Sequence, residues 1–428
     1  MAERMPAWVR PRRPTKVTAD DASPRRWWSF YLLALGAGLG LAVVVYRAAL
    51  LPAKFFYDGD RIRGIALGTG SAFGDHSYQA MGDLYRVTGL AGNDLLVGIV
   101  GFGGLLLLVL IVRLRGSAAP RLSLEIATII TLFLGGVYLS WYSKDPVVLP
   151  ITALIALPSS PRLRWDVLAV LAMAAYAVEF RTYWALVAAL YVALRLLRVE
   201  RRGLRIAVLL ALASTLVAGT VLLVALGVDP DHFRSVVNSA RVGSADAQSA
   251  IEPFLTDPEP WSGFLNVCLT LLALVIPLPL AGNGGLYYLA LAVLIAFLWI
   301  VFGRALTRYP SGRTAEIPAA VSRSIALLVA YLAVQALFEP DYGSALRHLT
   351  PLLPCLLVVL ANRPHREVEP RQRRPHARVA VARVGTGMKQ PAWLDPTRET
   401  VKRVAPAPRS ATSRMPNVIR HIRTNRSP

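Results

Sequence analysis

Several apolar runs in the sequence approach the length that a helix needs to cross a lipid bilayer. The clearest lie at 27–46, 95–112, 206–226 and 286–302, and about 20 residues span the hydrocarbon core. Because lipid offers the backbone no hydrogen-bond partner, a chain that crosses it forms helices or a closed barrel. A barrel would show segments of about ten residues with alternating polarity, and this sequence has none. The expected fold class is therefore all-α, a polytopic integral membrane protein.

Composition supports this class. Of the 428 residues, 54% are hydrophobic and only 17% are charged, whereas soluble domains are about a quarter charged. The two cysteines, Cys268 and Cys355, both lie within apolar segments. They indicate neither a disulfide framework nor a metal site.

The net charge of +21 is unevenly distributed along the chain. The tail 362–428 carries 16 Lys and Arg against 4 Asp and Glu, and segment 1–26 is also basic. Nucleic-acid binding is one interpretation, but no nucleic-acid-binding motif accompanies the charge. The other is a cytoplasmic location with attraction to anionic lipids. We therefore expect both termini in the cytoplasm, a disordered tail rich in Pro and Arg, anionic lipids as partners of the termini, and no nucleic-acid partner.

Arginines bracket three long apolar stretches, Leu122–Ser160, Trp165–Leu194 and Ser324–Ala361. At 1.5 Å per helical residue these stretches suit two crossings better than one. Since basic residues favour the cytoplasmic side, each stretch predicts a hairpin whose tip faces outward. The second hairpin is short, so its tip is expected below the outer surface.

The region 206–303 does not divide into hairpins so simply. Arg205 and Arg304 flank it and require an even number of crossings, yet it contains three apolar segments. The middle segment, 264–281, contains two prolines, which interrupt helices. We expect that segment to be re-entrant or interfacial, which leaves ten crossings in the transmembrane domain 27–361. The alternative is eleven crossings with the basic tail outside.

Two large loops, 47–93 and 228–262, are then expected on the outer face. In the first loop Phe73, Ser77, Met81 and Leu84 recur at helical spacing, which predicts a short amphipathic helix on the membrane surface. A simple linker resting on the membrane is the alternative. In the first apolar helix, the GxxxG spacing of two glycines predicts close helix packing; these are Gly36 and Gly40.

The first loop also holds acidic candidates for a site. Asp58 and Asp60 are separated by one glycine, a spacing at which two carboxylates bind a divalent cation or one of them serves as a base. A solvated loop is the alternative. Asp75 and His76 are the candidates in the predicted amphipathic helix.

The hairpin tips hold the remaining candidates. Lys144 and Asp145 form either a weak surface ion pair or part of a site. Arg181 either pairs with Glu179 or presents a guanidinium to a phosphate.

The tip of the third hairpin, Phe338–Pro354, is the densest in ionisable residues, which are costly at membrane depth and often functional. Arg347 and His348 either bind a phosphate or anchor the helix end. Asp341 is expected to act as a base or to orient His348.

Together these motifs resemble the bacterial Wzy/EpsG-type polysaccharide polymerases and, more loosely, the GT-C class of polyprenyl-dependent glycosyltransferases. The resemblance covers roughly residues 27–361 and consists of short motifs. The matching residues are Asp75, Tyr78, Tyr85, Ser143, Lys144, Asp145, Phe180, Arg181, Arg347, His348 and Pro351.

The resemblance implies glycosyl transfer or polymerisation of sugars carried on polyprenyl phosphate or pyrophosphate, on the outer face of the plasma membrane, for cell-surface polysaccharide. It implies that Lys144, Arg181 and Arg347 bind the phosphate. It also implies that other polysaccharide-assembly proteins are partners. No cofactor is expected beyond a divalent cation at the two first-loop aspartates. The implied base is one of Asp75, Asp341 and His348, with Asp58, Asp60 and Asp145 as secondary candidates. A flippase or transporter of lipid-linked saccharides, which forms no bond, is the alternative.

Overall fold

The computed structural model describes residues 23–72, 74–116, 121–239, 249–256, 260–309 and 317–362. These residues belong to a compact unit that ends at Glu367. Most of the predicted basic segment 1–26, all of the predicted tail beyond Asn362, and Phe73 of the predicted amphipathic helix lie outside the described residues.

Across those ranges the chain is helical, apart from an isolated bridge between Ala250 and Asp341. The expected all-α class is therefore confirmed for this part of the chain. The elements in chain order are α1 (Ser23–Leu50), η3 (Ala53–Phe55), α2 (Tyr57–Leu67), α3 (His76–Val87), α4 (Asp94–Arg115), α5 (Leu122–Tyr138), η4 (Asp145–Val148), α6 (Leu149–Ala156), α7 (Leu163–Glu179), α8 (Trp184–Leu196), η5 (Val199–Arg201), α9 (Gly203–Leu226), α10 (His232–Ser239), α11 (Pro260–Val275), α12 (Leu278–Gly282), α13 (Leu286–Leu306), α14 (Ala319–Phe338), α15 (Tyr342–Leu349), η7 (Thr350–Leu352) and α16 (Leu353–Ala361).

Six helices among the described residues are long and apolar enough to cross a membrane. They are Trp27–Leu50, Asp94–Arg115, Gly203–Leu226, Leu286–Leu306, Ala319–Phe338 and the continuous stretch Tyr342–Ala361. The stretches Leu122–Ser160 and Trp165–Leu194, predicted as hairpins, form pairs of helices that are individually shorter. Each of these pairs is broken at the predicted tip, where polar residues interrupt the apolar run.

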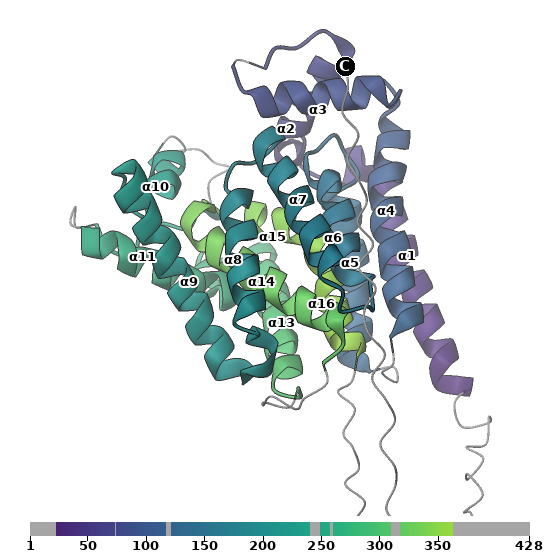
Figure 1. Cartoon of the computed structure of the whole chain (residues 1–428). Coiled ribbons are helices and arrows are strands. Elements are labelled where there is room, and N and C mark those ends of the chain that lie inside the picture. Colours follow the sequence, from purple (N-terminus) through teal and green to yellow (C-terminus); the bar gives the residue numbers. More distant parts are fainter. Residues whose placement is uncertain are drawn as a thin grey trace, which may run out of the picture. The chain divides into compact units, whose positions relative to one another are not determined.

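The helix α14 lies at the centre of the bundle, where α8, α9, α11 and α16 surround it. Nearly all of its side chains are buried. The short helices α2 and α3 lie across one end of the bundle (Figure 1). We call this end the α3 end, and the breaks between α5 and α6, α7 and α8, and α14 and α15 all contribute to it.

Glycines allow α1 to pack closely on α5. A Cβ atom at Gly40 would lie 2.6 Å from the carbonyl oxygen of Leu132 and 2.5 Å from the Phe102 ring, and Gly136 of α5 lies directly against Gly40. Gly36 packs on the backbone of Ile129. The predicted packing role of Gly36 and Gly40 is therefore confirmed.

This contact leads to a stability prediction for α1. Gly40→Ala is expected to lower the free energy of unfolding by about 1–3 kcal/mol, because the added methyl group has to displace backbone. Gly38 of the same helix has no atom within 4 Å of its Cβ position, so Gly38→Ala is the matched control. Unfolding of both variants in the same detergent measures the difference, and equal losses in the two would contradict the packing role of Gly40.

The predicted amphipathic helix is present as α3. The buried residues are Met81, Gly82 and Tyr85, whereas Leu84 is exposed. Gly82 lets α3 approach Ile65 of α2, where a Cβ atom would clash. The packing of α3 on α2 leaves Leu84, on the predicted apolar side of the helix, at the surface.

The opposite end of the bundle holds a buried arginine at the start of α14. Arg323 has no exposed surface, and its guanidinium donates to the carbonyl oxygens of Ile155 at 3.3 Å, Ser160 at 3.2 Å and Pro158. Cations stabilise the free carbonyl groups at a helix C-terminus. Arg323, one of the arginines that bracket the stretch Ser324–Ala361, therefore caps α6 inside the protein.

Candidate functional site

The break between α5 and α6 provides the centre of the candidate site. Pro146 lies in the first turn of η4, where a proline is tolerated because the N–H it lacks would have no partner within the helix. Just before it, the Ser143 hydroxyl donates to Asp145 Oδ2 at 2.7 Å and accepts from the Asp145 backbone N–H at 3.1 Å. This local turn directs the buried Asp145 carboxylate into the protein.

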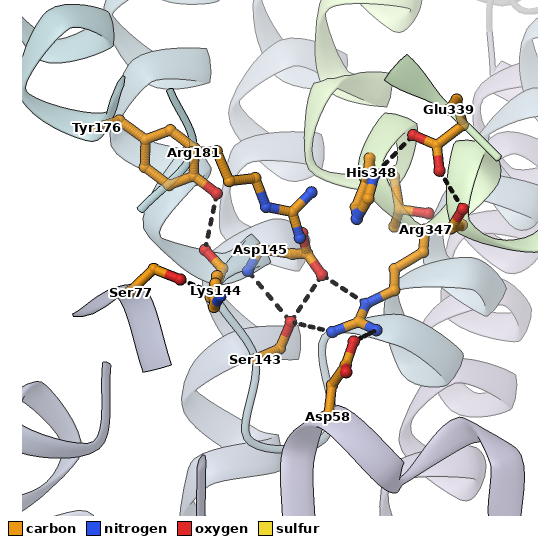
Figure 2. A network of polar contacts seen from close by, with 12 residues as sticks. Asp58, Ser77, Ser143, Lys144, Asp145, Tyr176, Arg181, Glu339, Arg347 and His348 are labelled. Carbon is orange, nitrogen blue, oxygen red and sulfur yellow. Dashed lines mark hydrogen bonds and ion pairs between the residues drawn. The ribbon is translucent and has the colours of Figure 1, made fainter. Parts of the chain in front are cut away.

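Two arginines from distant hairpins bind that carboxylate. Arg347 Nε lies 2.7 Å from Asp145 Oδ2, and Arg181 Nη2 lies 3.1 Å from Oδ1. The Asp145 side chain is 2% exposed, and those of Arg181 and Arg347 are 14% and 20% exposed. Figure 2 shows the three side chains converging. Charge-assisted bonds of this kind are among the strongest in proteins, and here they join the α5–α6, α7–α8 and α14–α15 breaks.

The helix α15 positions Arg347. Asp341 is its N-cap and accepts from the Ser344 backbone N–H at 2.8 Å, the usual role of an aspartate at that position. The remaining N–H groups of Arg347 bind Ser143 Oγ at 3.3 Å and Asp58 Oδ2 at 2.9 Å. All three nitrogens of its guanidinium are thus engaged.

His348 has a different carboxylate partner from the one expected. Its Nδ1 lies 2.9 Å from Oε2 of Glu339, a buried residue at the C-cap of α14. Asp341 was expected to orient His348, but its carboxylate serves the first turn of α15 and also contacts Ser249 at 3.5 Å. Glu339 was in the same tip of the chain and was not predicted as a site residue.

Asp58 joins the site from α2. Its carboxylate bridges Arg347 and the hydroxyl of Tyr78, which donates at 2.8 Å. Burial by itself would raise the pKa of Asp58, but the Arg347 charge and the Tyr78 hydrogen bond hold that pKa below its usual value. Asp58 therefore stays ionised at neutral pH.

Lys144 contributes a third cation. Its Nζ donates to Ser77 Oγ and lies 3.7 Å from the centre of the Tyr78 ring. Ser77 in turn donates to Asp75, the N-cap of α3, at 2.6 Å. Burial lowers the pKa of Lys144 to about 8, although the nearby Asp75 charge raises it. Lys144 is thus charged at neutral pH and loses its charge slightly above it.

The two first-loop aspartates do not act as a pair. Asp58 faces Arg347, whereas Asp60 accepts from Trp141 Nε1 at 3.2 Å. Residues two apart on a helix such as α2 point to different sides. In the part of the chain that the structure describes, no group of three or more His, Cys, Asp or Glu is placed to hold a metal ion.

Two ion pairs that were considered for the hairpin tips are not formed, because the residues have other partners. Asp145 pairs with Arg181 and Arg347 and not with Lys144, so a weak surface pair between Lys144 and Asp145 is wrong. Arg181 likewise pairs with Asp145, and its Nη1 donates to Tyr183 at 3.0 Å. Glu179, its predicted partner, is exposed on α7.

Most predicted site residues thus gather at the α3 end. Polar contacts and the Tyr78 ring join six of them: Asp58, Asp75, Lys144, Asp145, Arg181 and Arg347. His348 and Asp341 belong to an adjoining group of contacts through Glu339 and Ser344.

Some residues that make these contacts were not predicted as site residues. They include Ser77, Tyr176, Glu339 and Ser143. Ser143 directly precedes Lys144 in the sequence, and Glu339 lies in the tip of the third hairpin. These positions could have marked both residues as site candidates.

Fold and site together define an all-helical protein with membrane-length helices and a half-buried cluster of cations and carboxylates at one end. No protein-family model matches the chain, and neither a curated protein nor a solved structure shows a significant match.

The arrangement has two chemical capacities. Lys144, Arg181 and Arg347 contribute three cations to the same end of the bundle, and the structure leaves Lys144 without a carboxylate in direct contact among the described residues. Beside them, the neutral form of the His348 imidazole has one ring nitrogen that accepts a proton and one that donates a hydrogen bond. Anion binding next to a proton acceptor suits the transfer of a group that leaves as a phosphate.

Proposed function

We propose that the protein transfers or polymerises sugars carried on a polyprenyl phosphate or pyrophosphate. The single observation that carries this proposal is the convergence of Lys144, Arg181, Arg347 and His348 at the end of a bundle of membrane-length helices. A lipid-linked phosphate presents its charge at the end of an apolar chain. Cations at the end of membrane-length helices are therefore suited to bind such a phosphate.

In the proposed reaction the acceptor hydroxyl attacks the anomeric carbon, and the bond from that carbon to the phosphate oxygen breaks. The electron pair leaves with the phosphate, whose charge the three cations stabilise. The hydroxyl proton passes to His348 as general base. What favours His348 over Asp75 and Asp341 is that both carboxylates already cap helices, α3 and α15.

We further propose that the α3 end faces outward from the plasma membrane, with both termini in the cytoplasm and ten crossings. The position of α11 supports an even number. Its Asn266 and Thr270 bind Leu255 and Arg234, which belong to the preceding loop and to α10. A helix held to that loop along its length fits an interfacial position rather than an eleventh crossing.

The test uses purified protein in lipid vesicles with a polyprenyl-pyrophosphate-linked saccharide on one side. New glycosidic linkages and release of polyprenyl pyrophosphate are expected. Movement of the intact lipid-linked saccharide across the bilayer, without any new linkage, would replace the proposal with the flippase alternative.

Lys144 gives the proposal a pH dependence. Its ammonium, with a pKa of about 8, is protonated below pH 8 and attracts phosphate, and above pH 8 that attraction is lost. We expect kcat/KM, which reports the free enzyme, to fall about tenfold between pH 7 and 9.5, the size of one charged hydrogen bond.

The matched control is Lys144→Arg, which stays charged throughout this range. Its profile of kcat/KM is expected to remain flat up to pH 9.5. The same alkaline fall in both proteins would assign the titration to another group.

A further inference from the structure

The buried carboxylate of Glu339 lies outside the set of cations proposed to bind a phosphate. Its side chain is 3% exposed, and an ionised carboxylate is costly to bury unless it is hydrogen-bonded. Both of its oxygens are occupied: Oε2 contacts His348 Nδ1 at 2.9 Å, and Oε1 accepts from the Ser344 hydroxyl. The carboxylate therefore has a defined orientation toward the imidazole.

The first turn of α15 keeps this orientation rigid. Ser344 and His348 are four residues apart, so both side chains lie on the same face of the helix. The backbone N–H of Ser344 donates to Asp341 Oδ1 at 2.8 Å, and its hydroxyl lies 3.0 Å from Oδ2. The N-cap Asp341 thus holds Ser344, and Ser344 holds Glu339. Figure 2 shows Glu339 facing His348.

We propose that Glu339 is a positioning residue that sets the tautomer of His348. An ionised carboxylate only accepts hydrogen bonds, so Nδ1 carries the proton and Nε2 presents its lone pair. This inference rests on the proposed glycosyl transfer. In that reaction the acceptor O–H bond breaks as the new bond to the anomeric carbon forms, and the proton goes to Nε2. The adjacent carboxylate then stabilises the imidazolium, as an aspartate does in hydrolase triads.

The first test is spectroscopic and does not depend on activity. Protein labelled with ¹⁵N-histidine is studied by NMR at a pH where the imidazole is neutral, and His348→Asn identifies the His348 signals. We expect a protonated Nδ1 and an unprotonated Nε2 in the natural protein, and loss of this pattern in Glu339→Leu. An unchanged pattern in Glu339→Leu would overturn the assignment.

The second test is kinetic. Glu339→Gln is expected to lower kcat about tenfold to a hundredfold, within the range for general base catalysis. KM for the lipid-linked donor is expected to stay within about twofold, because the cations that bind phosphate are untouched. The matched control is Glu179→Gln, the same change at an exposed position on α7, which should leave both constants unchanged. An increase in KM with kcat unchanged would overturn the positioning role.

The two tests separate this inference from the function it rests on. If the natural protein forms no glycosidic linkage, the proposed function fails. The NMR comparison then still decides whether Glu339 sets the tautomer of His348. If linkages form and the NMR pattern is the same in both proteins, the function stands and the role of Glu339 is overturned.

Discussion

Arg347→Ala is expected to lower the rate of the proposed glycosyl transfer by about a hundredfold to a thousandfold. Arg347 binds Asp145, Ser143 and Asp58 at once, so its guanidinium is held in place before any substrate arrives. Removal of one fixed donor from a site that stabilises developing negative charge typically has an effect of this size. Initial rates of linkage formation at saturating lipid-linked donor, at equal amounts of folded protein, measure the loss.

Two further variants test whether the loss of rate is specific to the guanidinium of Arg347. Arg347→Lys keeps the charge but loses the planar fork, so an intermediate rate is expected. Arg63→Ala removes an arginine of α2 whose ion pair with Asp94 is partly exposed, and its rate should equal that of the natural protein. If Arg347→Ala transfers sugar at the natural rate, Arg347 has no role in the reaction.

Asp145→Ala is expected to cause the largest loss of stability, about 3–5 kcal/mol of the free energy of unfolding. The physical reason is that Arg181 and Arg347 both bind this buried carboxylate. Without it, two half-buried cations face each other uncompensated, and removal of one partner from a buried ion pair has a cost of this size. Unfolding in detergent, followed by circular dichroism, measures the difference.

The control for this prediction is an exposed ion pair. Asp83 pairs with Arg86 on α3, and both side chains are nearly half exposed, so Asp83→Ala should cost less than about 1 kcal/mol. Arg181→Met combined with Asp145→Ala should recover part of the stability, because it removes one uncompensated charge. A loss in Asp145→Ala no larger than in Asp83→Ala would show that the three-residue cluster does not hold the hairpins together.

The helical elements could be predicted because their causes are local. Apolar runs of membrane length predict helices wherever the backbone has no other partner, and the described residues are helical at each of them. The small side chains of Gly36 and Gly40 likewise indicated a close helix contact that the structure contains. The short helix α3 was also predicted from spacing, whereas its packing on α2 through Gly82 and Ile65 is a tertiary contact that spacing does not show.

The candidate site was predictable as a set of residues but not as a set of pairs. Polar residues at the breaks between helices were expected to gather on one side, and most of them do. Their partners lie far apart in the chain: Arg347 is 202 residues from Asp145, and Arg181 is 36 residues from it. The predicted pairs were near neighbours, Lys144 with Asp145 and Arg181 with Glu179, and both proved wrong.

The sequence by itself determined the class of fold and the location of the helix breaks, since both follow from local apolar length and the hydrogen bonds of the backbone. Only the tertiary structure decided which carboxylate each cation holds, and that Glu339 rather than Asp341 faces His348. The choice of partner depends on distance and burial, because charges interact strongly only when they are close and shielded from water. The packing of the helices sets both the distance between the charged groups and their burial.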